Sequence, residues 1–333
     1  MKKLLLIATG GTIASKFTES GLAPQLNAEE LLSYVPTARE FCTIDTIQPF
    51  SLDSTNVNAA HWIQLAGLIE KNYENYDGFV ICHGTDTMAF TAAALSYLIQ
   101  NNRRPVVITG AQKPIDLAIT DARSNLLDSL RFASHDKAHG VTIVFGGKVI
   151  CGTRAKKEFS KSYNAFSSIN YPAIASIHDE RIIFYIDDKN QCTAPLQFYH
   201  NMNERIFLLK LIPGINGKVL DALMDSHDGL MIESFGVGGL PNYGDDSFLK
   251  ALDKWISSGK LVALATQVTH EGSDMSVYQV GKVIKDRFQV LESYDMTLEA
   301  SVTKMMWVLG QSREPGKCRE MFYKTVNHDL LFL

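Results

Sequence analysis

The sequence lacks any apolar stretch long enough to cross a membrane, because none of its runs approaches the roughly 20 residues of a transmembrane helix. The apolar run near the start, Leu4–Ala8, is also shorter than the roughly 7–15 residues of a signal-peptide core. No lipidation motif is found at either end. We therefore expect Leu4–Ala8 to be a strand, and the protein to be cytoplasmic with no membrane partner.

An excess of basic residues is also missing. The chain of 333 residues has 32 Lys and Arg against 36 Asp and Glu, for a net charge of -4. Such a balance offers no basic surface to nucleic acid, so we expect no nucleic-acid partner. Hydrophobic residues at 46% and charged residues at 20% are typical of a folded globular protein, and the length suits two domains.

Cysteine and histidine patterns that hold metals or disulfide frameworks are absent too. The five cysteines are scattered, odd in number and without C-x-x-C spacing, which is typical of reduced, structural thiols: Cys42, Cys82, Cys151, Cys192 and Cys318. Among the nine histidines, His135 and His139 alone have H-x-x-x-H spacing, and no H-E-x-x-H motif is present. We therefore expect no metal site.

The stretch that organises the chain is a strand followed by a polar turn and a helix. Phe79–Cys82 is a short apolar run typical of a buried strand, and Met88–Gln100 has a helical pattern. The turn between them, Gly84–Thr87, carries two hydroxyls and a carboxylate. Open α/β sheets bind ligands at the carboxyl ends of their strands, so this turn is a candidate site. We interpret His83, just before it, as a packed or hydrogen-bonded turn residue.

A second turn of this kind follows the first strand. Leu4–Ala8 runs directly into Thr9-Gly10-Gly11-Thr12, where paired glycines allow close approach of a ligand and Thr12 offers a hydroxyl. A phosphate-binding role is the rival interpretation, but the turn has neither G-x-G-x-x-G nor a Walker motif. A threonine in such a turn is, by itself, more often a helix cap than a nucleophile.

Taken together, the two turns resemble a known family. Ala8-Thr9-Gly10-Gly11-Thr12-Ile13-Ala14 and His83-Gly84-Thr85-Asp86-Thr87 are similar to the two signatures of the bacterial-type L-asparaginases, including the glutaminase-asparaginases. Gly152-Thr153-Arg154-Ala155-Lys156-Lys157 resembles the family's Gly-x-Arg-x-x-Lys, which selects Lys157 and not Lys156 as the functional amine. The segments 234–239 and 295–300 resemble C-terminal elements of the family, so the likeness covers nearly the whole chain.

The alternation of strands and helices predicts an α/β protein of two domains with largely parallel sheets. We expect a larger catalytic domain over 1–186, a linker over 187–204 and a smaller domain over 205–333, as in the asparaginases. Two further segments are given specific interpretations: Ser15–Asn27 is expected to be a mobile loop that acts as a lid, and Leu117–Ser134 a helix. In the smaller domain we expect strands at 206–211, 230–233 and 261–266, and helices at 218–224, 247–257 and 297–309.

The resemblance implies hydrolysis of L-asparagine to L-aspartate and ammonia, through a threonine nucleophile and without a cofactor. It assigns Thr85, Asp86 and Lys157 to one catalytic set, in which a neutral amine accepts the proton of a hydroxyl. We favour Thr12 as the primary nucleophile, while the choice between Thr12 and Thr85 for the covalent ester stays open. The residues implied in substrate binding are Asp53, Ser54, Thr85, Asp86 and Ala111.

Two positions depart from the family's pattern. Several relatives place a catalytic tyrosine in the segment after the first threonine, where this chain has Leu22, and many have Asn where it has Gly239. We expect Tyr278 to replace the missing tyrosine and to reach the site from a partner subunit. That expectation requires a homodimer, or a tetramer built as a dimer of dimers.

Three other functions are weighed against an L-asparaginase. A glutaminase-asparaginase accepts both amides, and one methylene is worth only ~1–3 kcal/mol of discrimination. A component of a transfer-RNA-linked amidotransferase is disfavoured, because the chain begins at the first catalytic strand with no extra domain before it. A non-catalytic amino-acid-binding protein on the same fold is the third, since fold alone does not establish function.

Overall fold

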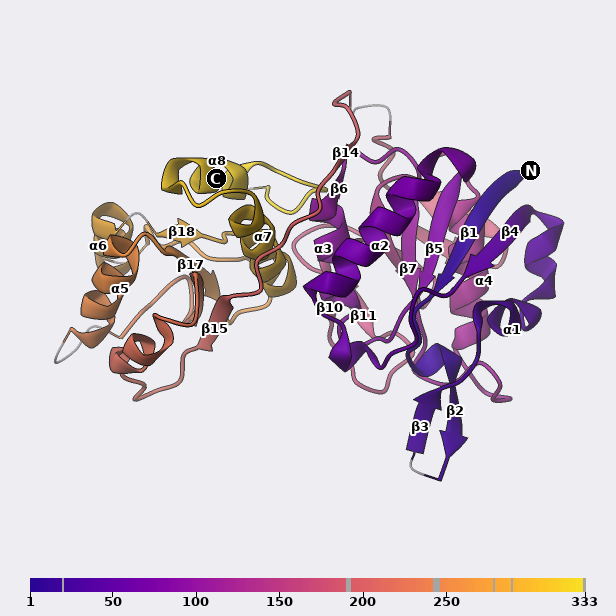
Figure 1. Cartoon of the computed structure of the whole chain (residues 1–333), viewed down its shortest axis with the longest axis horizontal. Coiled ribbons are helices and arrows are strands. Elements are labelled where there is room, and N and C mark those ends of the chain that lie inside the picture. The colour runs from indigo at the N-terminus through magenta and orange to yellow at the C-terminus, as the bar shows by residue number, and fades with distance from the viewer. Residues whose placement is uncertain (20, 190–192, 242–245, 278, 289, 332–333) are drawn as a thin grey trace. The chain divides into compact units, whose positions relative to one another are not determined.

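The computed structural model describes residues 1–19, 21–189, 193–241, 246–277, 279–288 and 290–331 (Figure 1). The chain forms two compact units, Met1–His200 and Asn201–Leu333. Each unit combines a mainly parallel sheet with helices, so the predicted α/β class is confirmed. The linker expected over 187–204 stays a prediction. No helix within the described ranges is long and apolar enough to span a bilayer.

The first unit is built on an eight-stranded sheet in the order β13-β12-β9-β8-β7-β5-β1-β4. Neighbouring strands at one end of the sheet are all parallel, and these are β4, β1, β5, β7 and β8. Strands β9, β12 and β13 continue the sheet antiparallel. Strands β5, β7 and β8 are buried on both faces, which agrees with their apolar runs, whereas β4 at the edge of the sheet is only partly buried. Their bounds are β1 (Lys2–Ala8), β4 (Cys42–Ile47), β5 (Gly78–Cys82), β7 (Val106–Thr109), β8 (Val141–Phe145), β9 (Lys148–Cys151), β12 (Ala175–His178) and β13 (Arg181–Phe184).

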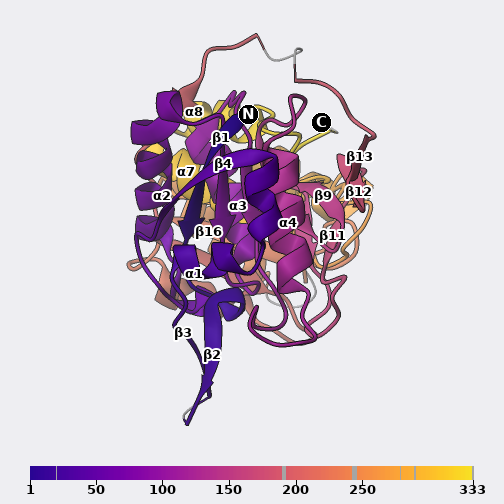
Figure 2. The same cartoon turned by 90° about the vertical axis from the view of Figure 1, so that its right-hand side faces the viewer.

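Helices cover both faces of this sheet. They are α1 (Ala28–Ser33), α2 (Ala59–Asn72), α3 (Met88–Leu98) and α4 (Ala122–Ala133). Figures 1 and 2 show α2 and α3 on one face and α1 and α4 on the other. Because side chains alternate along a strand, Leu4, Leu6 and Val80 point to one face, where they share a core with Leu31 of α1 and Leu126 of α4.

The segment expected to be a mobile loop is a β-hairpin, so the expected loop structure is wrong, while its role as a lid stays a prediction. Strands β2 (Ser15–Thr18) and β3 (Gly21–Pro24) pair antiparallel, and Figure 1 shows the hairpin projecting from the unit. Asn27 then caps α1, since its side chain accepts a hydrogen bond from the NH of Glu30. The polar composition hid the short strands, because neither carries the apolar run that signals burial.

Two predicted helix boundaries in this unit also differ. Helix α4 begins at Ala122 and not at Leu117, because the Thr120 hydroxyl accepts a hydrogen bond from the Ala122 NH, at 3.0 Å, and residues before it form turns. Helix α3 ends at Leu98 and not at Gln100. The reason is that β6 (Ile99–Gln100) pairs with β14 (Gln197–Phe198), which takes these residues out of the helix.

The second unit contains a four-stranded parallel sheet in the order β15-β16-β17-β18. Its core includes Trp255, Phe248, Leu220, Ile232 and Leu264. The helix expected at 218–224 is present as a 3₁₀ helix. The bounds are β15 (Ile206–Lys210), η5 (Gly217–Leu223), β16 (Gly229–Ser234), α5 (Ser247–Ser257), β17 (Leu261–Thr266), α6 (Gln279–Phe288), β18 (Leu291–Glu292), α7 (Leu298–Gln311) and α8 (Pro315–Tyr323).

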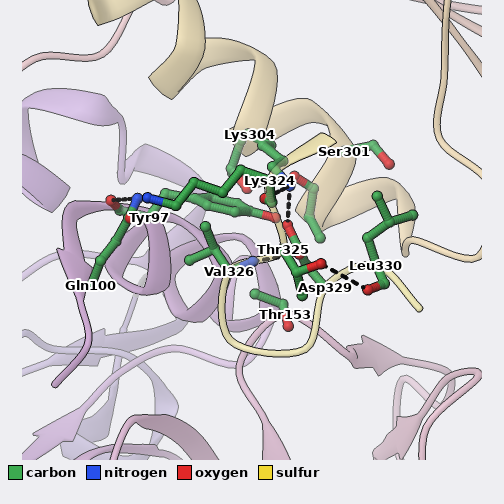
Figure 3. Close-up of polar contacts among 12 residues, drawn as sticks. Tyr97, Gln100, Thr153, Ser301, Lys304, Lys324, Thr325, Val326, Asp329 and Leu330 are labelled. Atoms are coloured by element: carbon green, nitrogen blue, oxygen red, sulfur yellow. Dashed lines mark hydrogen bonds and ion pairs between the residues drawn. The ribbon is translucent and has the colours of Figure 1, made fainter. Parts of the chain in front are cut away.

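The segment after α8 is fixed to α7 by an ion pair within the second unit (Figure 3). Lys304 Nζ lies 2.6 Å from Asp329 Oδ2 and donates to the Lys324 carbonyl at 2.8 Å. Asp329 Oδ1 accepts a hydrogen bond from the Val326 NH at 2.8 Å. The carboxylate therefore joins the helix amine to the backbone of the terminal segment.

Candidate active site

The candidate site begins where neighbouring parallel strands end in register. Ala8 of β1 lies opposite Cys82 of β5, and Cys82 lies opposite Thr109 of β7. The turns that follow these residues therefore leave the sheet side by side at its carboxyl edge, as predicted for ligand-binding turns. The chain after β4 joins them, since Gly10 forms a parallel bridge with Leu52.

Glycines allow the turns to pack backbone against backbone. A Cβ on Gly11 would lie 2.3 Å from the Gly84 nitrogen, and Gly11 has a φ of +76°. A Cβ on Gly84 would lie 2.6 Å from the Ser54 hydroxyl oxygen. Only glycine fits at these contacts, and the close approach gathers the turns that carry Thr12, Ser54 and Thr85.

Lys157 completes the cluster from β10 (Ala155–Lys157). Its Nζ lies 2.7 Å from Thr85 Oγ1 and 2.7 Å from Asp86 Oδ1. Thr85 is buried, whereas the side chain of Asp86 is 61% exposed and that of Lys157 is 17% exposed. The amine therefore stands between a buried hydroxyl and a carboxylate that faces solvent, in hydrogen-bond contact with both.

Two further hydroxyls at this edge are available to a ligand. Thr12 opens a short 3₁₀ turn (Thr12–Ala14), and Ser54 opens another (Ser54–Asn56). Within the part of the chain that the structure describes, neither hydroxyl makes a hydrogen bond. The Ser54 residue is only 3% exposed, so its hydroxyl lies within the edge of the sheet and not on the outer surface.

Asp53 and Ala111, both predicted to bind substrate, lie in turns at the same edge. Asp53 Oδ1 accepts hydrogen bonds from the NH and the hydroxyl of Thr55, at 2.9 and 2.8 Å, so it also caps the turn that Ser54 opens. Ala111 is fully buried in the turn after β7. A role of either residue in substrate binding stays a prediction.

His83 is a buried structural residue, as expected. Its Nδ1 lies 2.7 Å from the Gly84 carbonyl and its Nε2 lies 3.0 Å from Thr91 Oγ1. The Gly84 carbonyl can only accept, so Nδ1 carries the proton of the neutral ring and Nε2 accepts from the Thr91 hydroxyl, whose oxygen also accepts from Trp62 Nε1 at 2.9 Å. Burial lowers the pKa of His83 to about 4 and keeps the ring neutral. The neutral ring donates to the Gly84 carbonyl and so fixes Gly84, the residue just before Thr85.

The sequence did not reveal the network that holds the turn after β7. Asp121 and Asn125 are almost fully buried, and the Asp121 carboxylate accepts hydrogen bonds from the NH groups of Gln112 and Lys113. Asn125 donates to the Gly110 carbonyl at 3.0 Å. An acidic residue just before a helix is a common cap signal, but nothing in the sequence indicated which backbone groups it binds.

Three other positions were singled out in the sequence. Tyr278 lies outside the described residues. Leu22 is 46% exposed on β3, opposite Phe17. Gly239 closes a tight turn in the second unit, in which its NH donates to the Phe235 carbonyl at 2.7 Å. No group of three His, Cys, Asp or Glu side chains in the described ranges is arranged to bind a metal ion.

A hydroxyl held by an amine, which is itself paired with a carboxylate, is typical of hydrolases that use a hydroxyl nucleophile. Comparison with known families agrees with this class. Residues 3–190 match the family model described as "Asparaginase, N-terminal", and residues 205–322 match the "Glutaminase/Asparaginase C-terminal domain". The chain therefore belongs to the asparaginase family, a family of amidohydrolases.

Individual relatives cover most of the chain. An L-asparaginase of Thermococcus kodakarensis is 35% identical over 97% of this chain and 98% of its own length. One subunit of a glutamyl-tRNA(Gln) amidotransferase from Pyrococcus abyssi is 31% identical over 96% of this chain but 75% of its own length. The solved structure of the thermostable L-asparaginase from T. kodakarensis matches with a TM-score of 0.93 at 34% identity, covering 99% of this chain and all of that one.

Proposed function

We propose that the protein hydrolyses L-asparagine to L-aspartate and ammonia through a threonine nucleophile, without a cofactor. The observation that carries the proposal is the position of Lys157 Nζ, 2.7 Å from both Thr85 Oγ1 and Asp86 Oδ1. An amine at this distance can take the proton of a hydroxyl when it is neutral, and the carboxylate orients it. The family membership and the likeness to an L-asparaginase support the same activity.

The proposed reaction has two steps. A threonine oxygen attacks the side-chain amide carbon of asparagine. Its proton passes to the Lys157 amine, directly if the nucleophile is Thr85 and by way of the Thr85 hydroxyl if it is Thr12, because Lys157 contacts Thr85. The proton is then delivered to the amide nitrogen, and the C–N bond breaks. Ammonia departs, and the aspartyl group stays bound to the threonine as an ester. Water attacks the ester and releases aspartate. We favour Thr12 for the ester, because its hydroxyl has no partner within the described residues and Thr85 is already held by Lys157.

Substrate binding is proposed at the walls of the same edge. A free amino acid presents an ammonium and a carboxylate, so its site needs acidic groups together with hydroxyl or backbone donors. Asp53 and Asp86 supply the acidic groups, while Ser54 and Thr85 supply hydroxyls. Ala111, which is fully buried in the turn after β7, is proposed to contribute its main chain and its methyl group to the substrate site.

Substrate range is the point on which alternatives differ. A glutaminase-asparaginase accepts both amides. The match to the glutaminase/asparaginase family model is compatible with such an enzyme and with an L-asparaginase. The likeness to the P. abyssi amidotransferase component supports a second alternative, ammonia supply to a partner enzyme, although this chain covers three quarters of that relative. A non-catalytic amino-acid-binding protein is the third. We propose the L-asparaginase because the relative with 35% identity is matched over 98% of its length.

Assembly and location complete the proposal. We propose a homodimer, or a tetramer built as a dimer of dimers, in which Tyr278 of one subunit completes the site of another. The protein is proposed to work in the cytoplasm on a small-molecule substrate, without nucleic acid.

The test is ammonia release by the purified protein alone from L-asparagine, L-glutamine and D-asparagine. We expect turnover of L-asparagine, with the Lys157→Met variant as the matched inactive control. Comparable kcat/KM on the two L-amides would favour the broader enzyme. No release from any amide would overturn the enzymatic proposal, and release only after adding a partner and transfer RNA would favour the amidotransferase.

A further inference from the structure

Gln112 connects the turn after β7 with the segment that follows Lys157. Its main-chain NH donates to both carboxylate oxygens of Asp121, at 3.1 and 2.9 Å. Its side-chain amide nitrogen donates to the carbonyls of Phe159 and Ser162, at 3.2 and 3.1 Å. Both N–H bonds of the amide are thus used on one exposed turn that lies far away in the sequence.

The backbone of Gln112 is a rigid anchor. Asp121, which is 5% exposed, also accepts hydrogen bonds from the Lys113 NH at 3.1 Å and from Asn125 Nδ2 at 3.2 Å. Asn125 in turn accepts a hydrogen bond from the NH of Gly146 at 2.9 Å. A buried carboxylate that is satisfied by several N–H donors is costly to move, so this network fixes the turn.

The anchored segment belongs to the hairpin that presents Lys157. Strand β10 ends at Lys157, which pairs with Phe166 of β11 (Phe166–Ser168), and residues 158–165 form the loop between them. Phe159, two residues beyond Lys157, has a side chain that is 49% exposed, so side-chain packing fixes this loop only weakly. Within the loop, the NH groups of Glu158 and Phe159 donate to the Ala165 carbonyl, at 2.9 and 3.3 Å, and the hydrogen bonds from Gln112 tie the loop to the turn after β7.

We propose that Gln112 is a positioning residue that, through this loop, sets the place of the Lys157 amine relative to the Thr85 hydroxyl. The inference rests on the proposed function, which makes Lys157 the proton acceptor. A proton acceptor works within about 2.6–3.2 Å of the donor, and the observed 2.7 Å lies at the short end of this range. A shift of about 1 Å can reduce turnover roughly 100-fold, so a loosened loop lowers kcat while substrate binding is retained.

The test compares Gln112→Leu with Thr120→Val. The Thr120 hydroxyl donates to the Lys113 carbonyl and accepts from the Ala122 NH, both at 3.0 Å, but makes no bond to residues 158–165. Its loss perturbs the same turn without touching the loop, so Thr120→Val is the matched control. We expect Gln112→Leu to lower kcat on L-asparagine about 10- to 100-fold with KM changed less than about threefold, and Thr120→Val to stay near the wild type. Gln112→Glu keeps the shape but turns an oxygen toward two carbonyls, and it should lose at least as much.

A second readout separates positioning from general damage. In a Lys157→Met background, Gln112→Leu should cause no further loss, because a residue that acts through Lys157 has nothing left to position. Amide hydrogen exchange in residues 158–165 should be faster in Gln112→Leu and unchanged in Thr120→Val.

Three results would overturn the inference. They are a kcat of Gln112→Leu within twofold of the wild type, the same loss in both backgrounds, and unchanged exchange in the loop. A wild-type protein that releases no ammonia would instead show that the proposed function has failed, and the catalytic role of Gln112 with it. The exchange measurement does not depend on activity, so it still decides in that case whether Gln112 holds the loop.

Discussion

At the scale of single residues, the site depends on which of two neighbouring lysines faces the threonines. Lys156 and Lys157 are adjacent on β10, and successive side chains of a strand point to opposite faces. The resemblance of the motif selected Lys157, and the structure places its amine against Thr85 and Asp86. Composition and charge alone could not have made that choice, since both residues belong to one basic patch.

We predict that Lys157→Met lowers kcat on L-asparagine by about 10²–10⁴-fold, the usual share of a general base. Lys156→Met, which removes the same charge one residue earlier, should keep kcat within about threefold. Steady-state ammonia release from both variants, each checked by far-UV circular dichroism, makes the comparison. Equal losses in the two variants would show that overall charge, and not the position of one amine, is what matters.

His83 gives a residue-scale prediction for stability. Its pKa is lowered by burial from 6.5 to about 4, so between these pH values the unfolded chain binds one proton more than the folded one. The contribution of His83 to stability is therefore fully present above pH 6.5 and is lost as the pH drops, by about 1 kcal/mol per unit between pH 6 and 5.

The His83→Gln variant, which removes the titrating ring, should lack this contribution. Urea unfolding of both proteins at pH 7, 6 and 5 measures the difference. Parallel pH dependences in the two proteins would contradict the neutral, buried histidine.

At the scale of elements, the strands that end at the site were predicted well because they are short, apolar and buried on both faces. The apolar runs before Thr9 and His83 predicted the ends of β1 and β5 correctly, and their starts within two residues. The hairpin of β2 and β3 was missed because its residues are polar or half exposed. The sequence therefore shows no apolar pattern that would indicate the two strands. The hydrogen bonds of Gln112 were missed because a turn glutamine belongs to no motif, and its partners are set by tertiary structure.

The packing of the turns gives an element-scale prediction. A Cβ at Gly84 would lie 2.6 Å from Ser54, so Gly84→Ala must push apart the turns after β4 and β5. We expect a loss of about 1–3 kcal/mol in the free energy of unfolding, and a kcat at least about tenfold lower because Thr85 moves with its turn.

Gly67→Ala in helix α2 is the matched control. Nothing lies within 4 Å of a Cβ there, so the helix should gain about 0.5–1 kcal/mol and activity should not change. Chemical unfolding and ammonia release on both variants are the measurements. A Gly84→Ala enzyme as stable and active as the wild type would mean that the turns do not pack as described.

At the scale of the whole molecule, the proposal requires that sites combine residues from two subunits. Tyr278 lies outside the described residues, so the prediction is tested in solution. Equal amounts of Thr12→Ala and Tyr278→Phe subunits, each inactive alone, should recover about a quarter of the wild-type rate per subunit after exchange: half of the dimers are mixed, and each mixed dimer has one intact site.

A mixture of Thr12→Ala and Lys157→Met subunits is the control for this experiment. Both changes lie in the first unit, so no subunit in the mixture carries an intact set and no activity should return. Rescue in the control, or none in the test mixture after verified exchange, would contradict a shared site. Light scattering on the wild-type protein gives the number of subunits independently.

The central claim is that threonine hydroxyls in this site carry out amide hydrolysis. The most direct measurement is kcat for ammonia release from L-asparagine by the wild type, Thr12→Ala and Thr85→Val, with folding followed by far-UV circular dichroism. The account predicts turnover by the wild type and losses of several orders of magnitude in each variant, with unchanged spectra. Near-wild-type turnover by either folded variant would contradict it, because that threonine would then only cap a turn.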